Sequence, residues 1–85
     1  MNEPPVVATR CLALVDELVR DQERKALACG REIAPAIAWE DLHNFDDVPA
    51  LAHDPRFTYE AGCVSGLLAA QTALRALLKD LDAGR

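Results

Sequence analysis

The segment WEDLHNFDDVPALAHDP, at residues 39–55, carries most of the side chains in this chain that could do chemistry. It holds both histidines, the single tryptophan, one of the two phenylalanines and five carboxylates, with no lysine or arginine. This set fits a metal centre, a catalytic pocket or a binding edge for another protein. A purely structural interpretation competes with all three, because Asp beside Pro or Asn commonly caps turns and aromatics commonly close cores.

A metal centre would use His43, His53 and the nearby carboxylates. Imidazole and carboxylate groups are suitable ligands for zinc, but a helical zinc pair requires histidines at i and i+4 together with a third ligand. The two histidines here are ten residues apart, with a proline between them. We therefore keep a metal-binding helical protein as the alternative function and expect no bound metal or other cofactor.

A catalytic pocket finds little support in the motifs. Cys63 with His53 as its base lacks a third group to orient the imidazole, and a thiol on an apolar helix is more often a small hydrophobe. The run GCVSG places Ser65 one position late for a nucleophile elbow, and no strand is predicted before it. A glycine-rich phosphate loop is also missing. The sequence therefore predicts a protein that is not an enzyme and has no catalytic residues.

The charge is distributed unevenly along the chain. The net charge is −5, and residues 31–60 carry all of that imbalance, with seven acidic and two basic side chains. The residues before them sum to −1 and those after them to +1. A protein that binds the phosphate backbone needs a basic face, so direct nucleic-acid binding and a DNA-binding regulator are disfavoured. The acidic middle third instead fits a partner protein with a basic surface.

The acidic segment also contains aromatics, and aromatic anchors with a charged rim are typical of binding edges. An acidic surface can imitate a nucleic-acid backbone and occupy a channel on another protein, as small inhibitors of the phage or mobile-element type do. We therefore expect a non-catalytic module that binds or inhibits a partner protein through residues 39–57. The expected contact residues are Trp39, Glu40, Asp41, Phe45, Asp46, Asp47 and Asp54. For Phe57 and Tyr59 we expect core positions, whereas the sequence leaves open whether Trp39 and Phe45 face inward.

The elements that must position this segment are predicted to be helices. Eighty-five residues make one domain, 1–85, and a composition that is 51% hydrophobic but only 5% aromatic favours helix. The fold class is all-α: two long helices, about 6–29 and 56–83, pack as a hairpin with a short middle helix, about 35–43. We expect the long helices to be antiparallel, although the sequence leaves parallel packing open. We expect a frayed N-terminus at residues 1–5. Boundary signals are Pro5, Gly30 and Gly84, with Asp54 as cap and Pro55 at the first helical position, or Thr58 as the cap of a slightly later start.

Each long helix carries an apolar stripe. On the first, a face is formed by Val7, Cys11, Leu14, Val15, Leu18, Gln22 and Cys29. On the second, a leucine stripe (Tyr59, Cys63, Leu67, Ala70, Leu74, Leu77, Leu81) adjoins a glycine–alanine stripe (Gly62, Gly66, Ala69, Ala73, Ala76). One neighbouring helix cannot cover both stripes. Either the middle segment covers the remainder, or a homodimer buries it through the face of Gly62, Gly66, Ala69 and Ala73.

The expected location is the cytoplasm. No uncharged apolar run approaches the roughly 20 residues of a membrane span, and the start lacks the basic and apolar pattern of a signal peptide. We therefore expect no membrane contact. Three cysteines, an odd number without close pairing, fit a reducing compartment better than a disulfide framework.

Overall fold

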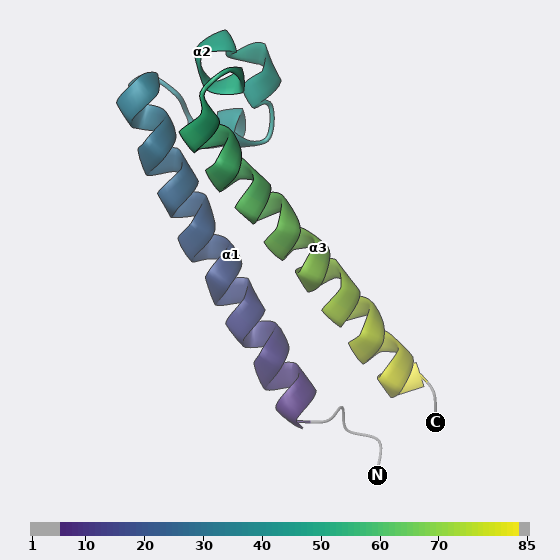
Figure 1. Cartoon of the computed structure of the whole chain (residues 1–85). Helices are drawn as coiled ribbons and strands as arrows, with labels where there is room; N and C mark the ends of the chain where they lie inside the picture. Colours follow the sequence, from purple (N-terminus) through teal and green to yellow (C-terminus); the bar gives the residue numbers. More distant parts are fainter. Residues whose placement is uncertain (1–5, 84–85) are drawn as a thin grey trace.

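The computed structural model describes residues 6–83, and every regular element in that range is helical. The expected frayed segment 1–5 and the predicted helix stop at Gly84 lie outside the described residues. Two long helices, α1 and α3, lie side by side, and short helical turns between them form a cap at one end of the hairpin (Figure 1). The predicted all-α hairpin is confirmed. The elements in chain order are α1 (Val6–Ile33), η1 (Trp39–Leu42), η2 (Phe45–Asp47), α2 (Pro49–Ala52) and α3 (Pro55–Ala83), where η marks a 3-10 helix.

The long helices run antiparallel, as expected. Gln22 Nε2 donates to Glu60 Oε1 at 2.5 Å near the capped end, and Gln71 Nε2 donates to Asp16 Oδ1 at 2.7 Å farther along. Residue numbers therefore fall on α1 as they rise on α3. The start of α1 and the end of α3 therefore lie at the same end of the rod, which measures 53 × 18 × 18 Å (Figure 1).

The first helix does not stop at Gly30, and its predicted end at residue 29 is wrong. Gly30 is buried within α1, and its carbonyl accepts a hydrogen bond from Ala34 N–H at 2.7 Å. A Cβ placed on Gly30 would lie 2.5 Å from Ile37 Cδ1 and 3.1 Å from Phe57 Cε1. The missing side chain thus serves close packing here. The helix ends at Ile33 instead, since the residue before Pro35 is disfavoured in the helical conformation.

The middle helix is shorter than predicted. Residues 35–38 are not helical, so Pro35 opens a turn, and the helical part of the predicted 35–43 segment is the single 3-10 turn η1. Pro49 begins one further helical turn, α2. The start of α3 follows its signals: Asp54 Oδ1 accepts hydrogen bonds from the N–H groups of Arg56 and Phe57, and Pro55 takes the first helical position.

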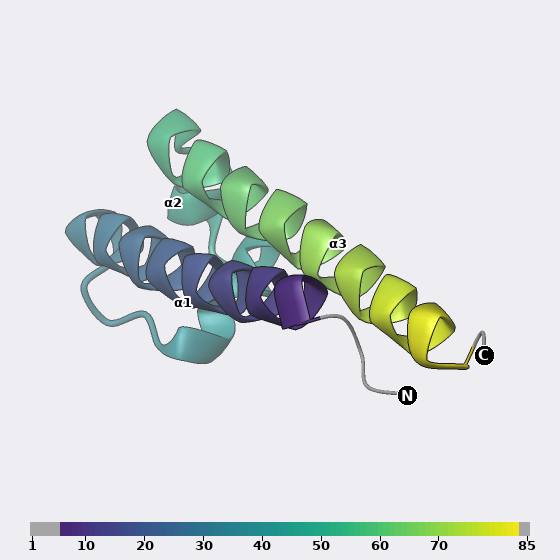
Figure 2. The ribbon, with the colours of Figure 1, turned by 90° about the horizontal axis from the view of Figure 1, so that it is seen from below.

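The connected core lies at the capped end, and Val19, near the middle of α1, is a buried hydrophobic residue outside it. Phe57 and Leu51 are the largest fully buried side chains of the core, and Phe57 is a core residue as predicted. Ile37 and Leu42 also point inward, because η1 and α2 fold over one side of the hairpin (Figure 2). The buried cluster consists of Ala26, Ile37, Leu42, Leu51, Phe57, Ala61 and Val64.

Two predictions about inward-facing residues are wrong. Tyr59 is 69% exposed, because it lies on the side of α3 turned away from the cluster around Phe57. On α1, most of the predicted apolar face points outward: Val7, Cys11, Leu14 and Leu18 are exposed. The helix is turned so that a neighbouring stripe packs inward, with Val19, Ala26 and Gly30 buried.

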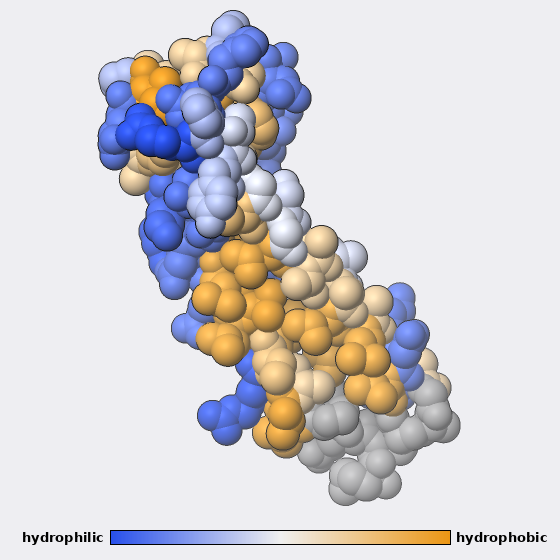
Figure 3. Space-filling view, in the orientation of Figure 1, coloured by the Kyte–Doolittle hydropathy of each residue, from blue (hydrophilic) through white to orange (hydrophobic). Residues whose placement is uncertain are grey.

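The half of the hairpin away from the cap has no core. None of residues 6–18 and 65–83 is buried, although Leu12, Val15, Leu74 and Leu78 are half-buried. Figure 3 shows the consequence, a broad apolar surface that extends over both long helices. Helix α3 is long and apolar enough to cross a membrane by length and composition alone, with a mean hydropathy of 1.4 over 18 residues. Its run without charge between Glu60 and Arg75 spans only about 21 Å, shorter than a bilayer core of about 30 Å.

Candidate functional site

The expected contact residues fall into two groups in the structure. Trp39 begins η1 and is 43% exposed, so the largest aromatic of the chain is on the surface. Phe45 begins η2 and is half-buried, with its ring 5.2 Å from the ring of Phe57 at an interplanar angle of 73°. This edge-to-face contact fixes η2 on the core. Phe45 therefore acts as a structural anchor, and Trp39 is the aromatic available for a partner.

The acids divide in the same way. Asp41 Oδ2 accepts a hydrogen bond from Ala38 N–H at 2.8 Å, and Asp54 caps α3. These two carboxylates hold turns. Glu40, Asp46 and Asp47 are exposed, and their carboxylates form no hydrogen bond or ion pair within residues 6–83. Of the five predicted acids, these three remain available as a charged surface.

The site is presented by short 3-10 turns, and local hydrogen bonds hold those turns in place. Asn44 Nδ2 donates to the Glu40 carbonyl at 3.3 Å, and Asp47 N–H donates to the Asn44 carbonyl at 3.1 Å. A 3-10 helix places residues i and i+3 on one side, so consecutive acids in such turns point in different directions. We name the exposed set Trp39, Glu40, Asp46 and Asp47 the acidic edge.

The two histidines are used separately. His43 Nε2 lies 3.6 Å from Glu23 Oε2 of α1, and His53 Nδ1 lies 2.9 Å from the Pro49 carbonyl oxygen. Within the described range, residues 6–83, no group of three or more His, Cys, Asp or Glu side chains is placed to hold a metal ion. The arrangement therefore gives the metal-binding alternative no site among these residues. Instead, each histidine ties one of the short turns to its surroundings.

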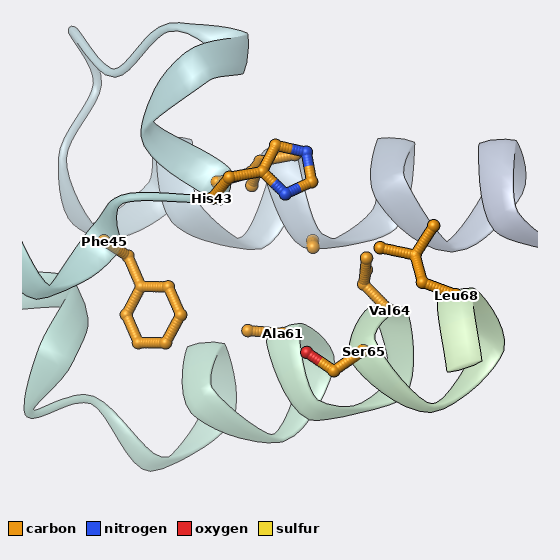
Figure 4. Close-up of a pocket in the computed structure, with 8 residues that line it drawn as sticks. His43, Phe45, Ala61, Val64, Ser65 and Leu68 are labelled. Atoms are coloured by element: carbon orange, nitrogen blue, oxygen red, sulfur yellow. The ribbon is translucent and has the colours of Figure 1, made fainter. Parts of the chain in front are cut away.

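A cavity of about 110 Å³ lies between the middle segment and the long helices (Figure 4). His43 and Phe45 line it from the middle segment, facing Ala61, Ser65 and Leu68 of α3. Sites for small molecules usually measure about 300–1,000 Å³, so this cavity is small for a substrate or cofactor. Ser65 and His43 both line the cavity and are not joined by a hydrogen bond.

The thiols do not add a reactive centre to this site. The three cysteines, Cys11, Cys29 and Cys63, form no disulfide. Burial raises the pKa of Cys29, a change that Arg56 opposes and that Asp54, Glu32 and Glu60 reinforce. A thiol with a raised pKa is protonated at neutral pH and is a poor nucleophile. Cys63 makes a side-chain hydrogen bond with Tyr59, which raises the pKa of the tyrosine hydroxyl.

The sequence predicted contact residues in this segment but could not separate the exposed acids from those that hold turns. The signal for Asp54 was present, since an Asp directly before a proline is typical of a helix start. For Asp41 no comparable local pattern existed. No protein-family model, curated protein or solved structure matches this chain. The function of the acidic edge is therefore argued from its own geometry.

Proposed function

We propose that this protein is a small non-catalytic interaction module that binds a partner protein with a basic surface through the acidic edge. The observation that carries the proposal is the exposure, on the contacting turns η1 and η2, of Trp39 and of three carboxylates, Glu40, Asp46 and Asp47, that form no hydrogen bond or ion pair within residues 6–83. Exposed tryptophans are enriched among the residues that dominate binding energy at interfaces. With three free thiols in the chain, we place its action in the cytoplasm.

The charges favour a basic partner for two physical reasons. Complementary charge accelerates the encounter of two proteins. The carboxylates of the acidic edge form no ion pair within residues 6–83, so their charge is available to a partner. Residues 31–60 carry −5 in total, so this end of the rod generates most of the molecule's negative potential. A partner that normally binds nucleic acid has such a basic surface. If this protein inhibits its partner by occupying that surface, it should compete with nucleic acid for the partner.

The test compares variants in a capture experiment with the folded full chain as bait, in which mass spectrometry identifies the captured proteins. Trp39→Ala should lower affinity for the same captured protein by about 2 kcal/mol or more, roughly thirty-fold in Kd. Asp46→Lys with Asp47→Lys should slow association and reverse its dependence on salt. Asp80→Lys, an exposed charge reversal near the end of α3, is the matched control and should leave binding unchanged.

Two further measurements complete the test. Far-UV circular dichroism should show the same helix content in all variants, because neither Trp39 nor the two aspartates are buried. If the partner binds nucleic acid, added protein should displace it. A captured protein that binds the Trp39→Ala variant and the double charge reversal as tightly as it binds the unmodified chain would refute the acidic edge as the binding site.

A further inference from the structure

On one side of the hairpin, exposed apolar residues are regularly spaced along both long helices. Exposed Val7, Cys11, Leu14 and Leu18 of α1 alternate at intervals of four and three residues. On α3 the same alternation runs through Cys63, Leu67, Ala70, Leu74 and Leu77, which are exposed or half-buried. This is the heptad spacing of a helix–helix seam, and none of the named positions on either helix is charged. We name these nine residues the bare face.

A second seam on each helix is already used inside the hairpin. On α3 it runs through Phe57, Ala61, Val64 and Leu68, again at intervals of four and three, and these side chains pack in or against the core cluster. Each helix therefore carries two parallel heptad seams of which only one faces its neighbour. Two seams per helix are typical of a four-helix bundle, in which each helix contacts two others.

The middle segment does not cover the bare face. The cavity under η1 and η2 is lined on α3 by Ala61, Ser65 and Leu68, and helical rotation of 100° per residue places Ser65 opposite Leu74. Figures 1 and 2 agree, because η1 lies behind the hairpin in the view of Figure 1, whereas Figure 3 shows the apolar surface in front. Val7, Leu14 and Leu77 on this side are 74%, 56% and 50% exposed.

The exposed area of the chain exceeds that of a compact monomer by about the area that each partner contributes to a dimer interface. The chain exposes 5752 Å², whereas a compact monomer of 9.3 kDa exposes about 5000 Å². The excess of roughly 800 Å² is close to the area that each partner contributes to a standard protein interface. Neither residues 6–18 nor residues 65–83 bury a side chain, so the half of the hairpin without a core contributes to this exposed area.

Charge favours an identical copy as the occupant. Residues 6–20 carry two basic and two acidic side chains, and residues 61–83 also carry two of each, so copies stacked over these regions do not repel. The negative charge is concentrated in residues 31–60 at the capped end. Repulsion between two such ends favours an arrangement in which the caps point in opposite directions.

A bilayer surface suits the bare face less well. Helices that lie on membranes combine an apolar side with lysine and arginine along its polar rim, which attracts anionic lipids. This chain has nine basic and fourteen acidic residues. Its charge would oppose approach to an anionic membrane, whereas a second copy presents a face of the same length, spacing and neutrality.

We propose that the bare face is a homodimer interface on which a second copy of this chain packs to complete a four-helix bundle, with the capped ends at opposite poles. The bundle supplies a core for the uncapped half of each hairpin. It also leaves an acidic edge at either end, so one dimer presents two binding sites. The interface is the leucine side of α3 and not the glycine–alanine stripe, since the heptad seam runs through the leucine side and Gly62 and Gly66 lie outside it.

The primary test is the native mass of the unmodified chain, measured by light scattering after size exclusion between about 1 and 100 µM. The expected mass at the upper concentration is twice 9.3 kDa, and the melting temperature should rise with concentration because association stabilises the folded state. A monomer across this range, with a melting temperature independent of concentration, would overturn the proposal. If that monomer bound neutral phosphatidylcholine vesicles, the bare face would instead be a membrane-contact surface.

Matched variants locate the interface. Leu14→Glu with Leu77→Glu should shift the mass to that of a monomer, because each change buries a charge in the proposed seam. Ala69→Glu and Ala73→Glu place the same charge on the glycine–alanine stripe and should leave the dimer intact. The reverse pattern, a dimer that survives the leucine changes and dissociates with the alanine changes, would assign the interface to the other stripe and refute the bare face.

Discussion

Asp54 and Asp46 are eight residues apart and look equivalent in the sequence, yet they act differently. The Asp54 carboxylate accepts hydrogen bonds from two N–H groups at the start of α3, at 2.9 Å from Arg56 N and 3.0 Å from Phe57 N. The Asp46 carboxylate accepts none from residues 6–83. The first end of a helix lacks internal acceptors for its N–H groups, so Asp54 supplies a bond that the backbone cannot.

At the residue scale we predict that Asp54→Ala lowers the free energy of unfolding by about 1 kcal/mol, the usual effect of losing an N-cap. Asp46→Ala should change it by less than about 0.5 kcal/mol, as expected for a surface position without partners. Urea denaturation followed by circular dichroism measures both. Equal losses in the two variants would show that Asp54 does not cap α3.

At the scale of the elements, the glycines have two different roles. Gly30 is surrounded, because an added Cβ would lie 2.5 Å from Ile37 Cδ1 and 3.1 Å from the buried ring of Phe57. Gly62 is open, with nothing within 4 Å of an added Cβ. Both lie inside helices, where alanine is intrinsically more favourable than glycine by about 1 kcal/mol. Packing therefore decides the sign of the effect at Gly30, and helix propensity decides it at Gly62.

We predict that Gly30→Ala lowers the free energy of unfolding by about 1–2 kcal/mol, because overpacking in a full core exceeds the gain in helix propensity. The Ile37 methyl group can rotate away, but Phe57 is held by its contact with Phe45. Gly62→Ala should raise the same free energy by about 0.5–1 kcal/mol. Thermal melts of the two variants provide the comparison, and a loss of stability at Gly62 would reveal a contact on the glycine–alanine stripe.

At the scale of the whole molecule, stability is distributed unevenly along the rod. In the capped half the middle segment packs over the two helices, and this half contains seven of the eight buried hydrophobic residues. The other half consists of two helices alone. Most helical stability in proteins comes from the packing of an apolar face, and two helices alone bury little of it. If the bare face is a dimer interface, the uncapped half depends on the second copy.

Hydrogen exchange should show this division. In the monomeric Leu14→Glu, Leu77→Glu variant, backbone amides of residues 8–18 and 70–82 should exchange at least about tenfold faster than in the dimer. Amides around Ala26 and Ala61 should be less affected, because their protection comes from the core at the cap. Uniform acceleration along both helices would mean that the hairpin unfolds as one unit and that the cap is not independently stable.

The sequence by itself determined the helical elements and the position of the acidic segment. Those depend on local signals: alanine and leucine content, the cap at Asp54 and the fixed φ of Pro55. It also predicted a binding edge that contains Trp39, which stays a prediction, and it could not show which acids of that segment are exposed. A carboxylate that caps a turn and one that faces solvent differ only in the backbone conformation around them.

Only the tertiary structure decided which side of each helix faces inward. Both heptad seams of α3 are apolar, so periodicity alone could not choose between the one containing Phe57 and the one containing Tyr59. The choice came from the cap, because η1 and α2 bury Leu42 and Leu51 against one side only. Gly30 illustrates the same limit: a glycine that usually ends a helix lies within one here, since two distant side chains pack against its backbone. Such contacts join residues far apart in the chain, and local sequence does not encode them.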